Sequence, residues 1–378
     1  MTSNGSDAPS AGSNMTESIF LTYNMMTFHE EFAPASVMID RSISPIFYII
    51  GVFCNPLSAY IWLNKKTRRN NSSAIYLGTL SISHFVFLIL HIFVELNYAW
   101  GIKTYNGPIS CEIFNVIYYV PQYMAPLLVL SFTVERYIAV CHPFSKEKFC
   151  TVRRAIIAVV ILYISSMLLS VIQGYFWTYN PSLGDCDHRV EARLGGQTSI
   201  INVWTWISEL LIFAIVPLAA LVFNIFVINE IKSLTKRGPA YQQPGSGSPT
   251  ASTVTLLTVS FYLICTWLPA TLVYSLQNLF MANDRMTAEE IRADPEWRSY
   301  FIYITIRKAI EEITLSNSAC YFFIYCITGK HFRDQVCALF GLQKCVRSEE
   351  VPPPTYKQYM AVAKIDHVTN GHTSITSV

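Results

Sequence analysis

The sequence "SAIYLGTLSISHFVFLIL", residues 73–90, is almost continuously apolar and carries His84 in its middle. A stretch of this length predicts either a buried helix of a water-soluble protein or part of a membrane helix. A histidine inside lipid is costly unless it faces a helix interface or a polar cavity. The remainder of the chain decides between these interpretations.

The composition favours the membrane. Of 378 residues, 52% are hydrophobic and 14% are charged, whereas soluble domains carry about 25% charged residues. A membrane helix needs about 20 apolar residues. Seven long apolar runs lie at 43–64, 74–98, 112–141, 155–174, 203–228, 254–278 and 299–327. We therefore predict an all-α membrane protein with a seven-transmembrane helix bundle, in which the charged residues between 307 and 312 make the seventh run the weakest signal.

Basic residues predict the orientation. The loops after the first, third and fifth runs are rich in lysine and arginine, whereas the other loops and the N-terminal tail mix acids with bases. Because basic loops stay in the cytoplasm, we expect an extracellular N-terminus and a cytoplasmic C-terminus in the plasma membrane. Asn4 and Asn14 fit the glycan acceptor pattern on that tail. The first residues lack a signal-peptide pattern, so we expect the first helix to direct insertion.

Ten cysteines are present, and in this topology only Cys111 and Cys186 lie near the outer face. The oxidising compartment reaches only those two. We therefore expect them to form a disulfide that ties the loop at 175–200 to the top of the third helix. Two free thiols are the alternative.

The stretch "VERYIAVCHPF" at 134–144 closes the third run. It resembles the Glu/Asp-Arg-Tyr signature of rhodopsin-like (class A) G-protein-coupled receptors, and the interval from Cys111 to Arg136 is also that of the family. The resemblance covers residues 43–342 and extends, more loosely, to invertebrate neuropeptide receptors of the FMRFamide type. Its further motif residues are Asn55, Pro217, Trp267, Pro269, Tyr321 and Tyr325.

This resemblance implies a G-protein-coupling switch at the cytoplasmic end. Its residues are Glu135, Arg136, Tyr137, Pro269 and Tyr325. Arg136 would be held by an inward pair with Glu135 until a heterotrimeric G protein competes for it, because its guanidinium offers a planar fork of donors. Pro269 kinks its helix, so the inner half of the sixth helix could swing outward. An arginine that merely snorkels to the interface is the alternative.

His84 stands where the family usually carries a sodium-binding aspartate. Two other positions of that pocket differ as well, with Ala125 for a hydroxyl residue and Tyr321 for an asparagine. Hard cations prefer oxygen ligands, so we interpret the pocket as a dismantled sodium site with a His84–Tyr321–Asn317 network. A hydrogen-bonded interior histidine without regulatory role and a pH sensor are the alternatives.

Candidate ligand-binding residues lie near the outer mouth of the bundle. Glu95 and Glu311 are expected roughly 15 Å above the polar centre, from the helix rise per residue. Intramembrane acids indicate a functional site and could receive the arginine or amino group of a peptide. Internal pairing of Arg307 with Glu311 and of Lys308 with Glu312 is the alternative. The other candidates are Tyr118, Gln122, Trp267 and Tyr274.

The ligand class follows partly by exclusion. Tyr118 stands where amine receptors carry an aspartate, and Leu315 stands where opsins need a lysine. A mixed-charge, aromatic outer surface with Trp177, Tyr179 and Trp297 favours a neuropeptide, with a small molecule or lipid as the alternative. A transporter or channel would show repeats or broken helices. No catalytic or metal-ligand spacing is evident, so we expect no enzyme activity, cofactor, metal or nucleic-acid partner.

The C-terminal region predicts a short amphipathic eighth helix, with Phe332, Val336, Leu339 and Phe340 on one side. Cys337 and Cys345 are candidate palmitoylation sites or plain thiols. Residues 1–42 would form the extracellular tail, 43–342 the bundle with helix 8, and 343–378 a disordered cytoplasmic tail. In that tail, Pro353–Tyr356 suits a WW-domain ligase and Thr376–Val378 a PDZ domain. Serines and threonines at 369–377 are candidate phosphorylation sites for arrestin binding.

The altered pocket generates a first prediction. Replacing sodium by a large organic cation should change agonist affinity in membranes by less than about fivefold, the lower end of ordinary allosteric coupling, because imidazole is a poor sodium ligand. Radioligand competition in sodium and choline buffers measures this. A strong shift would contradict the loss of the sodium site.

Overall fold

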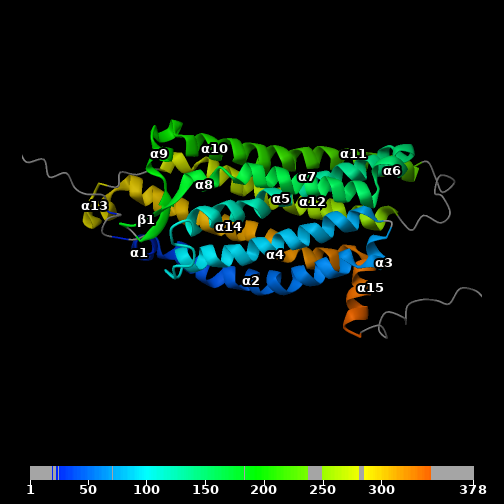
Figure 1. Cartoon of the computed structure of the whole chain (residues 1–378), viewed down its shortest axis with the longest axis horizontal. Coiled ribbons are helices and arrows are strands. Elements are labelled where there is room, and N and C mark those ends of the chain that lie inside the picture. The colour runs from blue at the N-terminus through cyan, green and yellow to red at the C-terminus, as the bar shows by residue number, and fades with distance from the viewer. Residues whose placement is uncertain are drawn as a thin grey trace, which may run out of the picture. The chain divides into compact units, whose positions relative to one another are not determined.

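The computed structural model describes residues 19, 23, 25–69, 71–182, 184–236, 249–280 and 285–341. The described contacts divide the chain into two compact units, Met1–Lys330 and His331–Val378. The first unit contains a bundle of long helices (Figure 1). The second contains most of α15 (Lys330–Leu339), at the position where the sequence predicts the eighth helix. The helix ends one residue before Phe340.

The long helices follow the predicted apolar runs in order. They are α2 (Pro34–Leu63), α4 (Ser72–Tyr98), α5 (Ser110–Cys141), α7 (Val152–Ser170), α12 (Pro249–Ser275), α14 (Pro295–Thr328), and the continuous stretch α10 (Ile200–Ser208), η3 (Glu209–Ile215) and α11 (Val216–Lys236). The first run is predicted to start at 43, whereas α2 starts at Pro34, since proline is favoured in the first helical turn. Asp40 and Arg41 therefore lie within this helix and not in a tail.

Short elements connect the long ones. They are α1 (Met25–Phe32), α3 (Lys65–Arg68), α6 (Pro143–Phe149), α8 (Gln173–Phe176), β1 (Trp177–Asn180), β2 (Asp185–His188), α9 (Val190–Arg193), η2 (Gly196–Thr198), η5 (Gln277–Phe280) and α13 (Ala288–Ala293). In Figure 1, β1, α1 and α13 lie at one end of the bundle, and α3 and α6 lie at the other. We call these the hairpin end and the arginine end, after the β1–β2 hairpin and Arg136.

Six helical stretches in the described part of the chain are long and apolar enough to cross a membrane. The seventh, α14, has 34 residues, but its charged residues lower its apolar character. Large apolar side chains face outward, such as Phe53, Leu168 and Ile327, which are 74%, 72% and 77% exposed. This pattern suits lipid contact, because helices in a bilayer need no apolar interior to associate.

Small and polar residues hold the helices together instead. A Cβ added to Gly51 of α2 would lie 2.1 Å from Leu88 Cδ1 of α4 and 3.3 Å from the Cα of Ala319 in α14. The three helices therefore meet at a position where any larger side chain would force Leu88 and the backbone of α14 to shift. Four residues further along α2, Asn55 Nδ2 donates to the carbonyl of Ser318 in α14 at 2.8 Å.

The hairpin end is fixed by the Cys111–Cys186 disulfide, as predicted. β1 and β2 are antiparallel, with Tyr179 opposite Cys186. Thr178 Oγ1 also donates to Glu112 Oε1 at 3.0 Å, so two contacts tie the hairpin to the start of α5. Burial and the nearby Arg193 lower the pKa of His188 on β2 to about 4, so this imidazole is neutral at pH 7.

The N-terminal segment forms a second cluster at the hairpin end. Phe28 of α1 packs on Trp297 of α14, with ring centroids 5.3 Å apart, and Ile19 and Ile291 complete the buried core. Trp297 is only 3% exposed. The expectation that it contributes to an exposed ligand-binding surface is therefore wrong, because α1 covers it.

The disulfide generates a stability prediction. Cys111→Ser should lower the free energy of unfolding by about 2–4 kcal/mol, since the bridge closes a sequence separation of 75 residues. Thermal unfolding of the purified protein in detergent measures this. Cys265→Ser, at an exposed free cysteine, is the control, and equal midpoints for both variants would contradict the structural role.

Candidate functional site

The floor of the candidate ligand site is an aromatic pair. Trp267 of α12 stacks on Phe213 of η3, with centroids 4.5 Å apart and planes inclined by 3°. Thr271 Oγ1 donates to the carbonyls of Phe213 and Trp267, each at 3.0 Å. The pair therefore joins α12 to the fifth helical stretch.

The local sequence explains this joint. Pro217 has no N–H, so the carbonyl of Phe213, four residues earlier, cannot receive its usual α-helical hydrogen bond. The backbone widens into the π-helical segment η3, where the N–H of Val216 bonds to the carbonyl of Leu211. The Thr271 hydroxyl supplies the missing donor. Sequence reasoning identified Pro217 and Trp267 but missed Phe213 and Thr271, although the missing proline N–H was a usable signal.

Aromatic rings line the interior above this floor. Tyr118 of α5 stacks against Phe87 of α4 at 5.9 Å and against Phe114 at 6.0 Å. Gln122 Nε2 donates to the carbonyl of Tyr118 at 3.3 Å, so the two predicted residues do share one face of α5. His91 Nδ1 and the Tyr48 hydroxyl are 2.8 Å apart and link α4 to α2.

Glu311 is neutralised inside the protein, which was one of the two alternatives. Its Oε1 accepts from the Tyr274 hydroxyl at 2.6 Å and from Arg307 Nε at 2.8 Å. Lys308 Nζ lies 3.2 Å from its other oxygen. Arg307 also stacks over the Tyr274 ring at 4.5 Å. Tyr274 and Glu311, two of the candidate ligand residues, are therefore in contact, but this carboxylate is already paired.

Two other carboxylates are less satisfied. Glu95 of α4 and Glu312 of α14 are both 6% exposed. Glu312 Oε1 accepts a hydrogen bond from Ser44 of α2. The predicted pair of Glu312 with Lys308 does not form, because Lys308 Nζ binds Asp40 at 2.8 Å. Among the described residues, Glu95 Oε1 and Glu312 Oε2 have no hydrogen-bond partner.

The His84 pocket is only partly as predicted. Tyr321 donates to Asn317 Oδ1 at 2.9 Å, and Asn317 Nδ2 donates to Thr266 Oγ1 at 2.9 Å. The ring of His84 contacts that of Tyr321 with centroids 5.0 Å apart, yet its Nδ1 has no partner among the described residues. His84 therefore packs against the network and is not hydrogen-bonded into it at Nδ1. Ala125 is buried and adds no polar group.

At the arginine end, Glu135 and Arg136 bind serines of α4. Glu135 Oε1 accepts from Ser72 Oγ at 2.6 Å, and Arg136 donates to Ser73 Oγ. Within the described residues the two charged groups form no ion pair with each other, so the predicted pair is replaced by two contacts to one helix end.

The other switch residues are packed. Tyr137 contacts Phe223 and Phe226 of α11 with centroids 5.3 and 5.9 Å apart. Tyr325 is fully buried and meets Trp62 of α2 edge-on at 5.5 Å. Pro269 lies inside α12, as expected.

Several predicted sites lie elsewhere. Cys337 is a half-buried free thiol on α15. Asn4, Asn14, Cys345, Pro353–Tyr356 and Thr376–Val378 lie outside the described residues.

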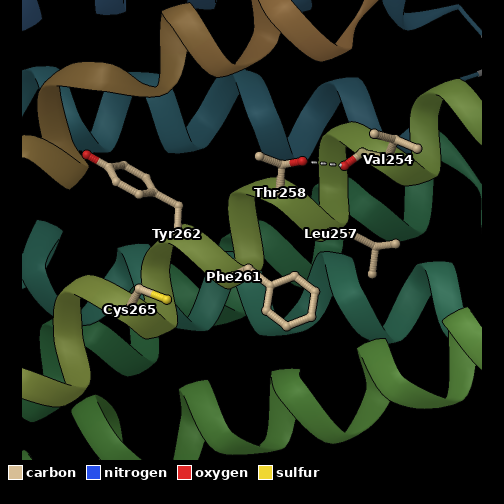
Figure 2. A pocket seen from close by; sticks show the side chains of 6 residues that line it. All are labelled: Val254, Leu257, Thr258, Phe261, Tyr262 and Cys265. Carbon is tan, nitrogen blue, oxygen red and sulfur yellow. Dashed lines mark hydrogen bonds between the residues drawn. The ribbon is translucent and has the colours of Figure 1, made fainter.

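A shallow cavity of about 400 Å³ follows α12 between Val254 and Cys265. Figure 2 shows that its six lining side chains all come from this helix, with Tyr262 nearest to α14. Nearly all of its lining is apolar, and none of the candidate ligand residues contributes to it. This groove is therefore distinct from the interior site.

Comparison with known proteins agrees with this architecture. The sequence pattern of the 7 transmembrane receptor (rhodopsin family) matches residues 55–306, which is more than half of the chain. The chain therefore belongs to the rhodopsin family of seven-transmembrane receptors. It is a multi-pass membrane protein, and α14 provides the seventh span.

Individual relatives match more limited segments. The chain is 30% identical to the pyrokinin-1 receptor of Drosophila melanogaster over 130 residues, covering 34% of this chain and 30% of the relative. It is 24% identical to neurotensin receptor type 1 of Rattus norvegicus over 195 residues, covering 49% of this chain and 45% of the relative. It is 23% identical to atypical chemokine receptor 2 of Mus musculus over 234 residues, covering 62% of this chain and 58% of the relative. Each match spans less than two thirds of the relative.

The Thr271 joint generates a prediction. Thr271→Val should destabilise the protein by about 1–3 kcal/mol, because the buried carbonyl of Phe213 loses its donor. Thermal unfolding in detergent measures the loss. Thr258→Val on the same helix is the matched control, since its hydroxyl bonds, within the described part of the chain, only to the carbonyl of Val254. Equal effects of the two substitutions would show that the joint is unimportant.

Proposed function

We propose that this protein is a G-protein-coupled receptor activated by an extracellular peptide. The observation that carries the proposal is the group of aromatic rings and carboxylates in the bundle near the hairpin end, where the disulfide anchors the hairpin to α5. Its relatives include receptors named for neurotensin, pyrokinin and chemokines, which supports a peptide over a small amine. A non-peptide small molecule or lipid is the second candidate, favoured only by the aromatic lining around Tyr118.

The proposed orientation places the hairpin end outside the cell. Basic residues gather in the loops at the arginine end, as cytoplasmic loops require. Asn4 and Asn14 then carry glycans, and the segment after α14 is cytoplasmic. The receptor acts at the plasma membrane.

The proposed signal passes along α12. A peptide that moves Trp267 displaces the joint with Phe213, and Pro269 allows the half of α12 at the arginine end to swing outward. Three hydrogen bonds oppose that swing: Thr133–Ser260 at 3.2 Å, Tyr262–Ser316 at 2.6 Å and Thr328–Thr255 at 2.9 Å. Once α12 has moved, Arg136 exchanges Ser73 for backbone carbonyls of the G protein.

Further partners belong to the proposal. Arrestin binds the phosphorylated tail, Cys337 and Cys345 anchor it through palmitoyl chains, and the motifs at Pro353–Tyr356 and Thr376–Val378 recruit WW-domain and PDZ proteins. The chemistry proposed is recognition and coupling, without catalysis.

A neuropeptide library screen tests the function. Cells expressing the chain should give a calcium or cyclic-nucleotide response to at least one peptide, whereas untransfected cells should not. Isotope flux without any second-messenger response would favour a transporter instead.

The coupling role of Arg136 gives a further prediction. Arg136→Gln should reduce G-protein activation by more than about tenfold, a loss of roughly 1.4 kcal/mol, because an amide lacks the charged donor fork. Nucleotide exchange on purified G protein measures coupling, and peptide binding to the same membranes should persist. Arg153→Gln, at an exposed arginine near the same end, is the control. Full activity of Arg136→Gln would exclude this role.

A further inference from the structure

A partly buried charged cluster joins three helices at the hairpin end. It contains four carboxylates and two cations: Asp40 on α2, Glu95 on α4, and Arg307, Lys308, Glu311 and Glu312 on α14. With every group ionised, the cluster carries two negative charges in excess. A charge excess inside a membrane bundle is costly unless a counter-charge or a proton compensates for it.

Both internal cations are already engaged. Lys308 Nζ lies 2.8 Å from Asp40 and 3.2 Å from Glu311. Arg307 binds Glu311 at 2.8 Å and Gln277 at 3.0 Å. These contacts account for two of the four carboxylates and leave Glu95 and Glu312.

A further basic residue on α2, Arg41, is also committed. Arg41, one residue after Asp40, binds Glu30 at 2.6 Å and the carbonyl of Ala99 at 2.7 Å, and it stacks over Trp100 at 5.3 Å. It therefore cannot neutralise the remaining pair without giving up these contacts.

Glu95 and Glu312 each present a buried oxygen without a partner among the described residues. Each is more than nine-tenths buried, and they lie within electrostatic range of each other and of Asp40. Ser44 satisfies only one oxygen of Glu312. Removing one partner of a buried charge pair leaves a large penalty, so two unpaired carboxylates in this position point to a missing cation.

We propose that Glu95 and Glu312 receive a positively charged group of the activating ligand, and that the guanidinium of an arginine fits them best. This inference rests on the proposed peptide-receptor function and specifies its ligand. A guanidinium offers five donors in one plane and stays charged when buried, so it can bridge carboxylates that come from two helices. A metal ion fits less well, since no three His, Cys, Asp or Glu side chains among the described residues are placed so that they could hold one.

The inference can be tested without knowing the natural peptide. The probes are arginine amide and citrulline amide, which match in shape but differ in side-chain charge. The protein is the full chain in lipid nanodiscs, and the readout is its thermal unfolding midpoint. Because a ligand that binds only the folded state raises this midpoint, saturating arginine amide should raise it by roughly 2 °C, and citrulline amide should leave it unchanged.

Two variants locate the effect. Glu95→Gln and Glu312→Gln keep the side-chain shape, and a glutamine at 312 can still accept from Ser44. Each should weaken arginine amide binding at least tenfold. Glu296→Gln is the matched control, because this exposed glutamate lies on the same helix far from the cluster. Two independent variants keep the test decisive if one of them folds poorly.

Other outcomes overturn the inference. Equal midpoint shifts with both probes, no shift with either, or an unchanged response in both variants would do so. A pH-dependent midpoint without arginine amide binding would also overturn it. In that case the midpoint of the unsubstituted protein would change between pH 6 and pH 8, those of Glu95→Gln and Glu312→Gln would not, and protons would be the compensating charge. If the library screen finds an activating peptide without a cation, the peptide-receptor function stands and this inference fails. If no peptide activates the receptor, the proposed function itself fails.

Discussion

Lipid offers no hydrogen-bond partners, and this constraint governs the structure. Every polar group in the bundle must find a partner inside the protein or in a ligand. The helices accordingly present Phe53, Leu168 and Ile327 outward and meet through Gly51 and Asn55. Among the buried carboxylates at the hairpin end, Glu95 and Glu312 each keep one oxygen without a partner within the described residues.

The two ends of the bundle use this constraint differently. At the arginine end, Glu135 and Arg136 bind Ser72 and Ser73 of the same chain, so another partner can compete for these contacts. At the hairpin end, Lys308 and Arg307 satisfy only Asp40 and Glu311. The first arrangement suits a partner that competes for existing contacts. The second suits a partner that brings a missing charge.

The sequence predicted features that depend on one residue type or one helix. The helical runs and the Cys111–Cys186 bridge follow from hydropathy, topology and redox chemistry, and the family resemblance placed Arg136 and Trp267. Contacts between distant segments were not predictable in this way. Spacing along one helix paired Lys308 with Glu312, whereas Lys308 binds Asp40 on α2. Trp297 looked like an exposed aromatic, since no local pattern shows that α1 covers it.

The joint between α12 and η3 has a mechanical consequence. Thr271 shares one hydroxyl proton between the carbonyls of Phe213 and Trp267. If α12 draws away, this proton stays with Trp267 on its own helix, and only the carbonyl of Phe213 loses a donor. No backbone turn unwinds, because the link is a side chain. Breaking this side-chain link alone therefore costs near one hydrogen bond, about 1 kcal/mol, in addition to the stacking of Trp267 on Phe213.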